Sequence, residues 1–209
     1  MGERTPRTVE VFAEISCPFA HVSLRRFVEA RRDAAAEEVG LRVFAWPLEL
    51  VNGKPLDPGF VADEIDDLRD QVAADLFTGF DRQVFPSTTI DALALCSSAY
   101  EAGMGVGEAV NLAVRDALFE WGRPVEDRAV LASIAVDHGV TLLDPDRARA
   151  LVEADLAEGR RREVIGSPHF FLVDGSLFCP GLDIERRGDP LPTPVDEGPF
   201  RAFLERAFA

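Results

Sequence analysis

The order of secondary-structure signals is the feature that most constrains the fold of this chain. Residues 8–16 (TVEVFAEIS) alternate apolar and polar side chains, which predicts a strand. A helical pattern starts at Pro18 and runs to Gly40, and residues 41–50 (LRVFAWPLEL) predict a second strand. A strand–helix–strand unit of this length predicts two parallel strands joined by a right-handed crossover.

The pattern then changes for about 100 residues and changes back. After a Pro- and Gly-rich loop at 51–59, the chain carries almost only helical periodicity. The predicted helices cover residues 62–77, 88–103, 105–122, 126–139 and 144–161. Residues 168–181 predict two short strands around a tight turn at Asp174-Gly175, and residues 197–208 predict a last helix. We therefore expect an α/β fold, with one domain formed by 1–59 and 161–209 and an all-helical insertion domain at 60–160.

Charge and hydropathy exclude several classes of function. The net charge of −15 and the pI near 4.6 argue against partners such as nucleic acid and anionic membrane surfaces, which require a basic footprint. No apolar run approaches the ~18 residues of a membrane span, and no secretory segment is expected at the N-terminus. We therefore expect a cytoplasmic protein. The acidic run DEIDDLRD (63–70) predicts a solvated helix face.

The three cysteines, Cys17, Cys96 and Cys179, lie far apart in the sequence. In a reducing compartment they do not predict a disulfide framework, and no cysteine or histidine cluster has the spacing of a zinc site. Cys96 lies in an apolar helical pattern and is expected to be a small core residue. The sequence thus predicts no metal and leaves Cys17 as the main chemical candidate.

Cys17 stands where the first strand gives way to the first helix. The free N–H groups and the dipole at a helix N-terminus favour a thiolate, and Pro18 suits the first helical position. Such a thiolate attacks a disulfide sulfur and forms a mixed disulfide. A dithiol centre would have its second cysteine three residues later, where this chain has Ala20. Resolution would then come from a small thiol, a partner protein or another cysteine.

A second segment, VIGSPHFF (164–171), is expected to meet Cys17. Pro168 opens a strand, which is a position that sheet hydrogen bonding allows, and it keeps Ser167 out of helical geometry. With this segment the chain resembles the DsbA-like thioredoxin-fold family, in its cytosolic branch, which is related to kappa-class glutathione transferases and 2-hydroxychromene-2-carboxylate isomerases. The motifs that carry the resemblance are SCPFA, WPLEL, FPSTTIDAL, ALFEWGRPVEDRAVLASIA, IGSPHFFLVDG and CPGLD.

The resemblance implies a thioredoxin-like fold with a helical insertion packed over the active-site end of the sheet. It also implies that Pro168 is cis and faces Cys17, and that the backbone of Ser167 binds the substrate. Ala20 departs from the dithiol members, and Cys17 itself departs from the transferase and isomerase branch, which has serine there. The cleft is expected to be lined by Phe19, Trp46 and the Pro168 loop, while Trp121 is expected in the core or at a cleft wall.

Three functions follow from these features. The first is a single-cysteine thiol–disulfide oxidoreductase that forms mixed disulfides with protein or small-thiol substrates through Cys17. The second is a thiol-dependent transferase or isomerase, and the third is a binding module without chemistry. No tightly bound cofactor is expected, although a low-molecular-weight thiol could be a co-substrate. The predicted substrate-binding residues are Pro18, Phe19, Ser167, Pro168 and Asp183, and the auxiliary candidates are His21 and Cys179.

The auxiliary role of Cys179 follows from the predicted hairpin. The strand after Pro168 runs away from the active site, and the turn at Asp174-Gly175 sends the chain straight back. Cys179 is therefore expected on the Cys17 side of the sheet, where it could act as a distant resolving thiol.

Overall fold

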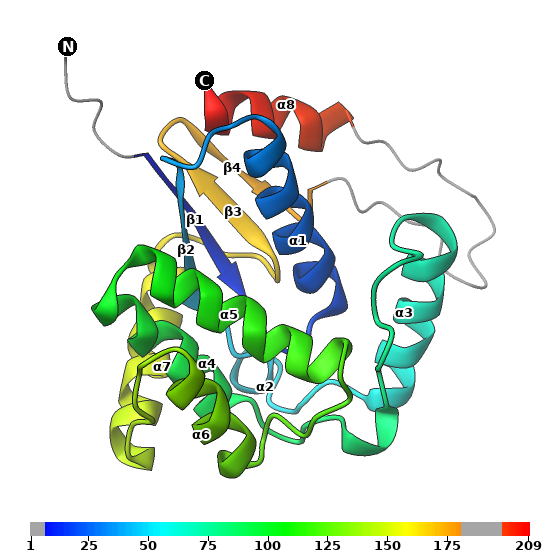
Figure 1. Cartoon of the computed structure of the whole chain (residues 1–209), viewed down its shortest axis with the longest axis vertical. Coiled ribbons are helices and arrows are strands. Elements are labelled where there is room, and N and C mark those ends of the chain that lie inside the picture. Colours follow the sequence, from blue (N-terminus) through cyan, green and yellow to red (C-terminus); the bar gives the residue numbers. More distant parts are fainter. Residues whose placement is uncertain (1–6, 181–197) are drawn as a thin grey trace.

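A four-stranded mixed sheet forms the centre of the protein. The computed structural model describes residues 7–180 and 198–209, and its sheet has the strand order β2-β1-β3-β4 (Figure 1). The strands are β1 (Thr8–Ala13), β2 (Gly40–Ala45), β3 (His169–Leu172) and β4 (Gly175–Phe178). β1 pairs with β2 in parallel, and β3 is antiparallel to both β1 and β4. This topology confirms the predicted fold class of an α/β protein with a thioredoxin-like sheet.

The two faces of the sheet pack against different helices. On one face lie α1 (Pro18–Asp33), which connects β1 to β2, and the C-terminal helix α8 (Gly198–Phe208). Their apolar side chains meet Phe170 of β3: its ring centroid lies 6.3 Å from that of Phe27 and 5.3 Å from that of Phe203. On the other face, Phe12 forms a smaller core with Trp46 and Leu156. Burial on both faces explains why β1 is apolar along most of its length.

The chain between β2 and β3 is described throughout and contains no strand. It holds the short α2 (Leu48–Val51), then α3 (Pro58–Gln71), α4 (Ile90–Ala99), α5 (Met104–Phe119), α6 (Arg128–Asp137) and α7 (Pro145–Arg161), with 3-10 turns η1 (Arg82–Val84) and η2 (Tyr100–Ala102). Figure 1 shows α4 to α7 gathered around the end of the sheet at which β1 and β2 finish. Among the described helices, none is long and apolar enough to cross a lipid bilayer.

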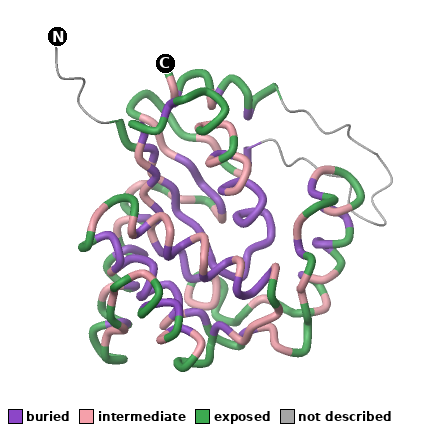
Figure 2. The backbone as a smooth tube through the Cα atoms, in the orientation of Figure 1, coloured by how far each residue is buried: buried purple, intermediate pink, exposed green. Residues whose placement is uncertain are grey.

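Polar side chains of this helical region bind the open edge of β2. The Tyr100 hydroxyl donates to the Leu41 carbonyl and accepts from the Val43 N–H, each at 3.0 Å. The Asp155 carboxylate accepts from the Ala45 N–H at 2.9 Å and from the Ser97 hydroxyl at 2.7 Å. The helices therefore satisfy backbone groups that an edge strand would otherwise expose. Figure 2 shows buried segments running through both the sheet and the helices. Their division into separate domains stays a prediction.

Several predicted element boundaries differ from the structure, and two of the differences have a clear local cause. α1 ends at Asp33 rather than at Gly40, because Ala35 has a left-handed φ of 49° that no helix interior tolerates. The second strand ends at Ala45 rather than at residue 50. Pro47 has no N–H to give to a ladder, and the chain turns into α2 directly after it.

Candidate active site

The predicted meeting of the two segments is present in the structure. Cys17 is the N-cap of α1, in extended geometry, and Pro18 opens the helix. The Cys17 Sγ donates a hydrogen bond to the Ser167 carbonyl at 3.3 Å. The Ser167–Pro168 bond is cis, and the Ser167 hydroxyl accepts from the Glu14 N–H at 2.9 Å. Sheet pairing explains the approach, because the end of β1 lies beside the start of β3.

A pocket of about 530 Å³ opens over Cys17. Its described lining comes from the start of α1, the chain from α2 to α3, the β4 end and the start of α8. These lining residues are Cys17, Pro18, Phe19, Leu48, Leu56, Phe60, Glu64, Ser167, Leu177, Phe178, Cys179, Pro180 and Pro199. The walls are mainly apolar, while Cys17 itself is only 6% exposed. A ligand would therefore meet apolar surface before it reached the sulfur.

The pocket differs from the predicted cleft at the tryptophans. Trp46 is not among its described lining residues: its indole is 4% exposed and packs edge-on against Phe12, on the opposite face of the sheet. Trp121 is 59% exposed, so the expectation of a core or cleft-wall position is wrong. The predicted solvated face of α3 is also wrong in part, because Glu64 and Asp67 are buried one helical turn apart. The acidic run did not indicate that these two carboxylates face the interior.

Of the other two cysteines, Cys96 lies in the core and Cys179 lies at the pocket. Cys96 is a buried core residue of α4, as predicted. Cys179 lines the same pocket as Cys17, and its backbone N–H donates to the Pro168 carbonyl at 2.9 Å. Cys17 and Cys179 thus contact adjacent carbonyls of the Ser167-Pro168 pair, and neither is in a disulfide. Cys179 also has a φ of 44°, which is uncommon for a residue with a side chain.

Burial dominates the ionisation of Cys17. It raises the pKa of the thiol to about 11, although hydrogen bonds from the Ala20 N–H and the Ser167 side chain act in the opposite direction. The buried Glu64 carboxylate adds to the rise, and the Arg115 guanidinium opposes it. The sequence predicted that the helix N-terminus would favour the thiolate. That influence is present, but it does not outweigh the loss of water around the sulfur.

Sequence reasoning missed two charged residues beneath the site. Arg115 of α5 is fully buried, and its Nη1 donates to the carbonyls of Glu14 at 2.7 Å and Ile15 at 3.4 Å. Its Nε donates to Asn111, one turn earlier, at 2.9 Å. The Glu14 carboxylate accepts from the backbone N–H groups of Ser16 at 3.2 Å and Leu48 at 2.8 Å. A polar pair at i and i+4 on an apolar helix face was the available signal for Arg115.

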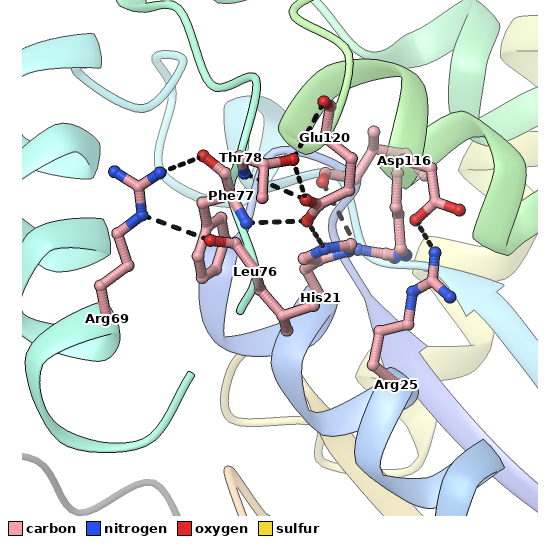
Figure 3. Close-up of polar contacts among 10 residues, drawn as sticks. His21, Arg25, Arg69, Leu76, Phe77, Thr78, Asp116 and Glu120 are labelled. Atoms are coloured by element: carbon pink, nitrogen blue, oxygen red, sulfur yellow. Dashed lines mark hydrogen bonds and ion pairs between the residues drawn. The ribbon is translucent and has the colours of Figure 1, made fainter. Parts of the chain in front are cut away.

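His21 is not among the described residues that line the pocket, and its side chain is directed toward Glu120 (Figure 3). Its Nε2 lies 2.8 Å from the Glu120 carboxylate, and its ring packs between Phe77 and Phe119. Burial lowers the pKa of His21, so the imidazole is held neutral. Glu120 also accepts from the backbone N–H groups of Phe77 and Thr78, at 2.8 and 3.0 Å. The geometry therefore gives His21 a joining role between α1, α5 and the 76–80 segment, without contact to the Cys17 sulfur.

Three of the five predicted substrate-binding residues are found in the described pocket lining. Pro18, Phe19 and Ser167 line the pocket, and Pro168 follows Ser167 directly. Asp183 lies outside the described residues. Within residues 7–180 and 198–209, no group of three or more His, Cys, Asp or Glu side chains is arranged to hold a metal ion.

Comparisons with known proteins agree with this architecture. The family model of the DSBA-like thioredoxin domain matches residues 8–186. A search of curated proteins gave no match. Several solved structures share the fold, among them the following three. A "probable DsbA oxidoreductase" from Streptomyces coelicolor is 22% identical, with a TM-score of 0.64 and coverage of 96% of this chain and 89% of the other.

The other two structures are more distant in sequence. The cytosolic disulfide reductase DsbM from Pseudomonas aeruginosa is 16% identical, with a TM-score of 0.59 and coverage of 95% and 97%. A 2-hydroxychromene-2-carboxylate isomerase is 14% identical, with a TM-score of 0.60 and coverage of 82% and 88%. At these identities the likeness establishes the fold, and the family model extends over most of the chain. The chain therefore belongs to the family of DSBA-like thioredoxin domains.

Proposed function

We propose that the protein is a thiol–disulfide oxidoreductase that works through the single thiol of Cys17. The observation that carries this proposal is the position of the Cys17 sulfur: at the N-terminus of α1, against the Ser167 carbonyl, and at the base of an apolar pocket. That position presents one nucleophile to a bound sulfur and excludes bulk water from it. Membership of a family of DSBA-like domains supports the same chemistry.

The reaction begins when Cys17 loses its proton to solvent or to the leaving group. The thiolate attacks one sulfur of a substrate disulfide R–S–S–R′, so that a Cys17–S–S–R bond forms and R′S⁻ leaves and takes up a proton. Substrate backbone that pairs with Ser167 would compete for the carbonyl that now accepts the Cys17 S–H. Substrate binding would thereby break the hydrogen bond between the Cys17 thiol and the Ser167 carbonyl.

The mixed disulfide then needs a second thiol. A low-molecular-weight thiol R″SH can attack the sulfur of R, which releases R–S–S–R″ and returns Cys17 to its thiolate. Cys179 is the alternative, because it lines the same pocket: its attack on the Cys17 sulfur would release RSH and leave a Cys17–Cys179 bond. We propose the external route in the cytoplasm, where small thiols are abundant, with no tightly bound cofactor.

A second function is favoured by one observation. With a thiol pKa of about 11, Cys17 is protonated at neutral pH and can donate its S–H as a serine hydroxyl would. In that role it would hold the sulfur of a bound external thiol while that thiol attacks an apolar substrate. The reaction would then be a thiol-dependent isomerisation or transfer.

Two variants separate these functions. Cys17→Ser keeps a hydrogen-bond donor and removes the nucleophile, whereas Cys17→Ala removes both. If the enzyme exchanges disulfides, both variants lose reduction of a peptide–thiol mixed disulfide. If it activates an external thiol, Cys17→Ser retains thiol-dependent turnover and Cys17→Ala does not. A binding module would bind its ligand equally in all three forms, and the native protein would show no turnover, which would contradict the proposal.

The route of resolution has its own test. Cys179→Ser should leave turnover with excess small thiol unchanged, because the external thiol completes the cycle. Peptide mapping after mild oxidation should show the external thiol on Cys17. A 17–179 linkage in the native protein, together with slower turnover of Cys179→Ser, would instead assign resolution to Cys179.

A further inference from the structure

Glu14 is the residue at which several segments around Cys17 meet. We propose that its carboxylate is a positioning group for the exchange reaction, and that it keeps the Cys17 sulfur at the base of the pocket by holding the backbone N–H groups of Ser16 and Leu48. The inference rests on the proposed reaction at Cys17. It adds a residue that acts through Cys17 rather than on the substrate.

The Glu14 carboxylate joins the Cys17 loop to α2. Glu14 directly follows β1 and is 1% exposed; its Oε1 accepts from the Ser16 N–H at 3.2 Å and its Oε2 from the Leu48 N–H at 2.8 Å. Ser16 precedes Cys17, so the first bond fixes the backbone immediately before the N-cap of α1. Leu48 opens α2 and lines the Cys17 pocket, so the second bond fixes part of the pocket wall.

The main chain of Glu14 binds two further segments, α5 and the start of the Ser167-Pro168 pair. Its N–H donates to the Ser167 hydroxyl at 2.9 Å, and the Ser167 carbonyl accepts from the Cys17 Sγ at 3.3 Å. Its carbonyl accepts from Arg115 at 2.7 Å. These main-chain groups remain when the side chain is changed, so a substitution at this position tests the carboxylate.

The carboxylate is enclosed behind the pocket wall. A cavity of about 10 Å³ lies beside it, which is room for about one water molecule. Leu48 and Leu56 line both this cavity and the Cys17 pocket, so they lie between the two. Burial raises the pKa of Glu14, while hydrogen bonds from the Thr89 side chain and from the two backbone N–H groups oppose the rise. Bulk water therefore cannot replace the carboxylate as the acceptor for these N–H groups.

A matched pair of variants tests this role. Glu14→Gln keeps the shape of the side chain but turns an amide NH₂ toward one of the two backbone donors, so one of the two bonds is lost. Glu14→Ala removes both. Asp155→Asn makes the first change at another buried carboxylate, which accepts from the Ala45 N–H and the Ser97 hydroxyl at the edge of β2. All variants are compared at a temperature at which circular dichroism shows them to be folded.

Loss of positioning should shift two rates in opposite directions. The kcat for reduction of a peptide–thiol mixed disulfide should fall about tenfold in Glu14→Gln and further in Glu14→Ala, because a misplacement of ~1 Å can cost about 100-fold. Alkylation of Cys17 by iodoacetamide at pH 8 needs only access to the sulfur. It should rise, by about tenfold for each unit by which the pKa of the thiol falls as water reaches it.

Cys96 and Asp155→Asn provide the controls. Cys96 is buried in α4, so peptide mapping of its alkylation in the same samples reports opening of the whole fold. Asp155→Asn should leave kcat and the alkylation of Cys17 near native. The positioning role would be overturned by equal effects of Asp155→Asn and Glu14→Gln, by a rise at Cys96 that matches the rise at Cys17, or by an unchanged kcat or unchanged alkylation of Cys17 in the Glu14 variants.

Failure of the proposed function gives a different result. In that case the native protein does not reduce the mixed disulfide faster than Cys17→Ser does. Alkylation then decides the role of Glu14 by itself: a rise at Cys17 in both Glu14 variants, without a rise at Cys96, supports the hold of the carboxylate on the sulfur. No rise would overturn it.

Discussion

At Cys17, burial and the helix N-terminus act on the thiol in opposite directions, and burial prevails. A pKa of about 11 leaves only about 1 in 10,000 molecules as thiolate at pH 7. The rate of Cys17 alkylation by iodoacetamide should therefore rise about tenfold per pH unit from pH 7 to pH 10 without levelling off. A plateau near pH 7 in stopped-flow alkylation would contradict this ionisation. Cys17→Ser supplies the background rate.

Arg115 is a fully buried side chain beneath this thiol. Arg115→Met removes a charge that favours the thiolate, so alkylation of Cys17 at pH 8 should slow. The same change leaves the Glu14 and Ile15 carbonyls without their donor, at a cost of about 1–3 kcal/mol in the free energy of unfolding.

Arg115→Lys separates the two effects. It keeps the charge and loses the fork of donors, so it should lose stability while its alkylation rate stays closer to native. Equal alkylation rates in the native protein and both variants would mean that Arg115 acts on the fold alone.

At the level of elements, the contact between α7 and the sheet depends on a glycine. A Cβ at Gly159 would lie 2.5 Å from the Trp46 ring and 3.0 Å from Phe12. Gly159→Ala should therefore destabilise the protein by about 1–3 kcal/mol, despite the better helix propensity of alanine. Gly105 of α5 is the matched control, because a Cβ there meets nothing within 4 Å, and Gly105→Ala should be neutral or stabilising by up to about 1 kcal/mol. Chemical denaturation measures both.

The link between α1, α5 and the 76–80 segment predicts sensitivity to acid. Burial alone would raise the pKa of Glu120, but hydrogen bonds from His21 and from the Phe77 and Thr78 N–H groups lower it to about 2. Because this folded pKa lies below the ordinary value of 4.5, the stabilisation is present above pH 4.5 and is lost as the pH falls toward 2. The depressed pKa of His21 adds a loss that begins as the pH falls through about 6.5.

Glu120→Gln should consequently be less stable than the native protein at pH 7 and should lose less stability between pH 4.5 and pH 2. Thermal unfolding followed by circular dichroism across this range measures the difference. Asp63→Asn, which changes an exposed carboxylate, should run parallel to the native curve. Parallel curves for Glu120→Gln as well would show that the carboxylate does not contribute to acid sensitivity.

For the whole molecule, the local sequence pattern predicted the helices and strands well, but it did not predict which ionisable side chains are buried. Strand alternation, helical periodicity and the Asp174-Gly175 turn identified the sheet and the long helices, since each depends on neighbours in sequence. Glu64 and Arg115 could not be placed this way. Their environments are made by segments far away in the chain: Arg115 binds the carbonyls of residues about 100 positions earlier. The predicted cleft position of Trp46 was wrong for the same reason. Its indole is buried by packing against α7, which is more than 100 residues away in the sequence.

The Ser167–Cys17 contact spans 150 residues, and this has a consequence for synthesis on the ribosome. Cys17 leaves the exit tunnel long before Ser167, Cys179 and most of the pocket walls exist. During that interval its sulfur is an ordinary exposed thiol, with a pKa near the ~8.5 of free cysteine and a correspondingly larger thiolate fraction. The nascent chain is therefore the form most open to oxidation at this residue. Protection of the thiol is acquired only when the last quarter of the protein has been made.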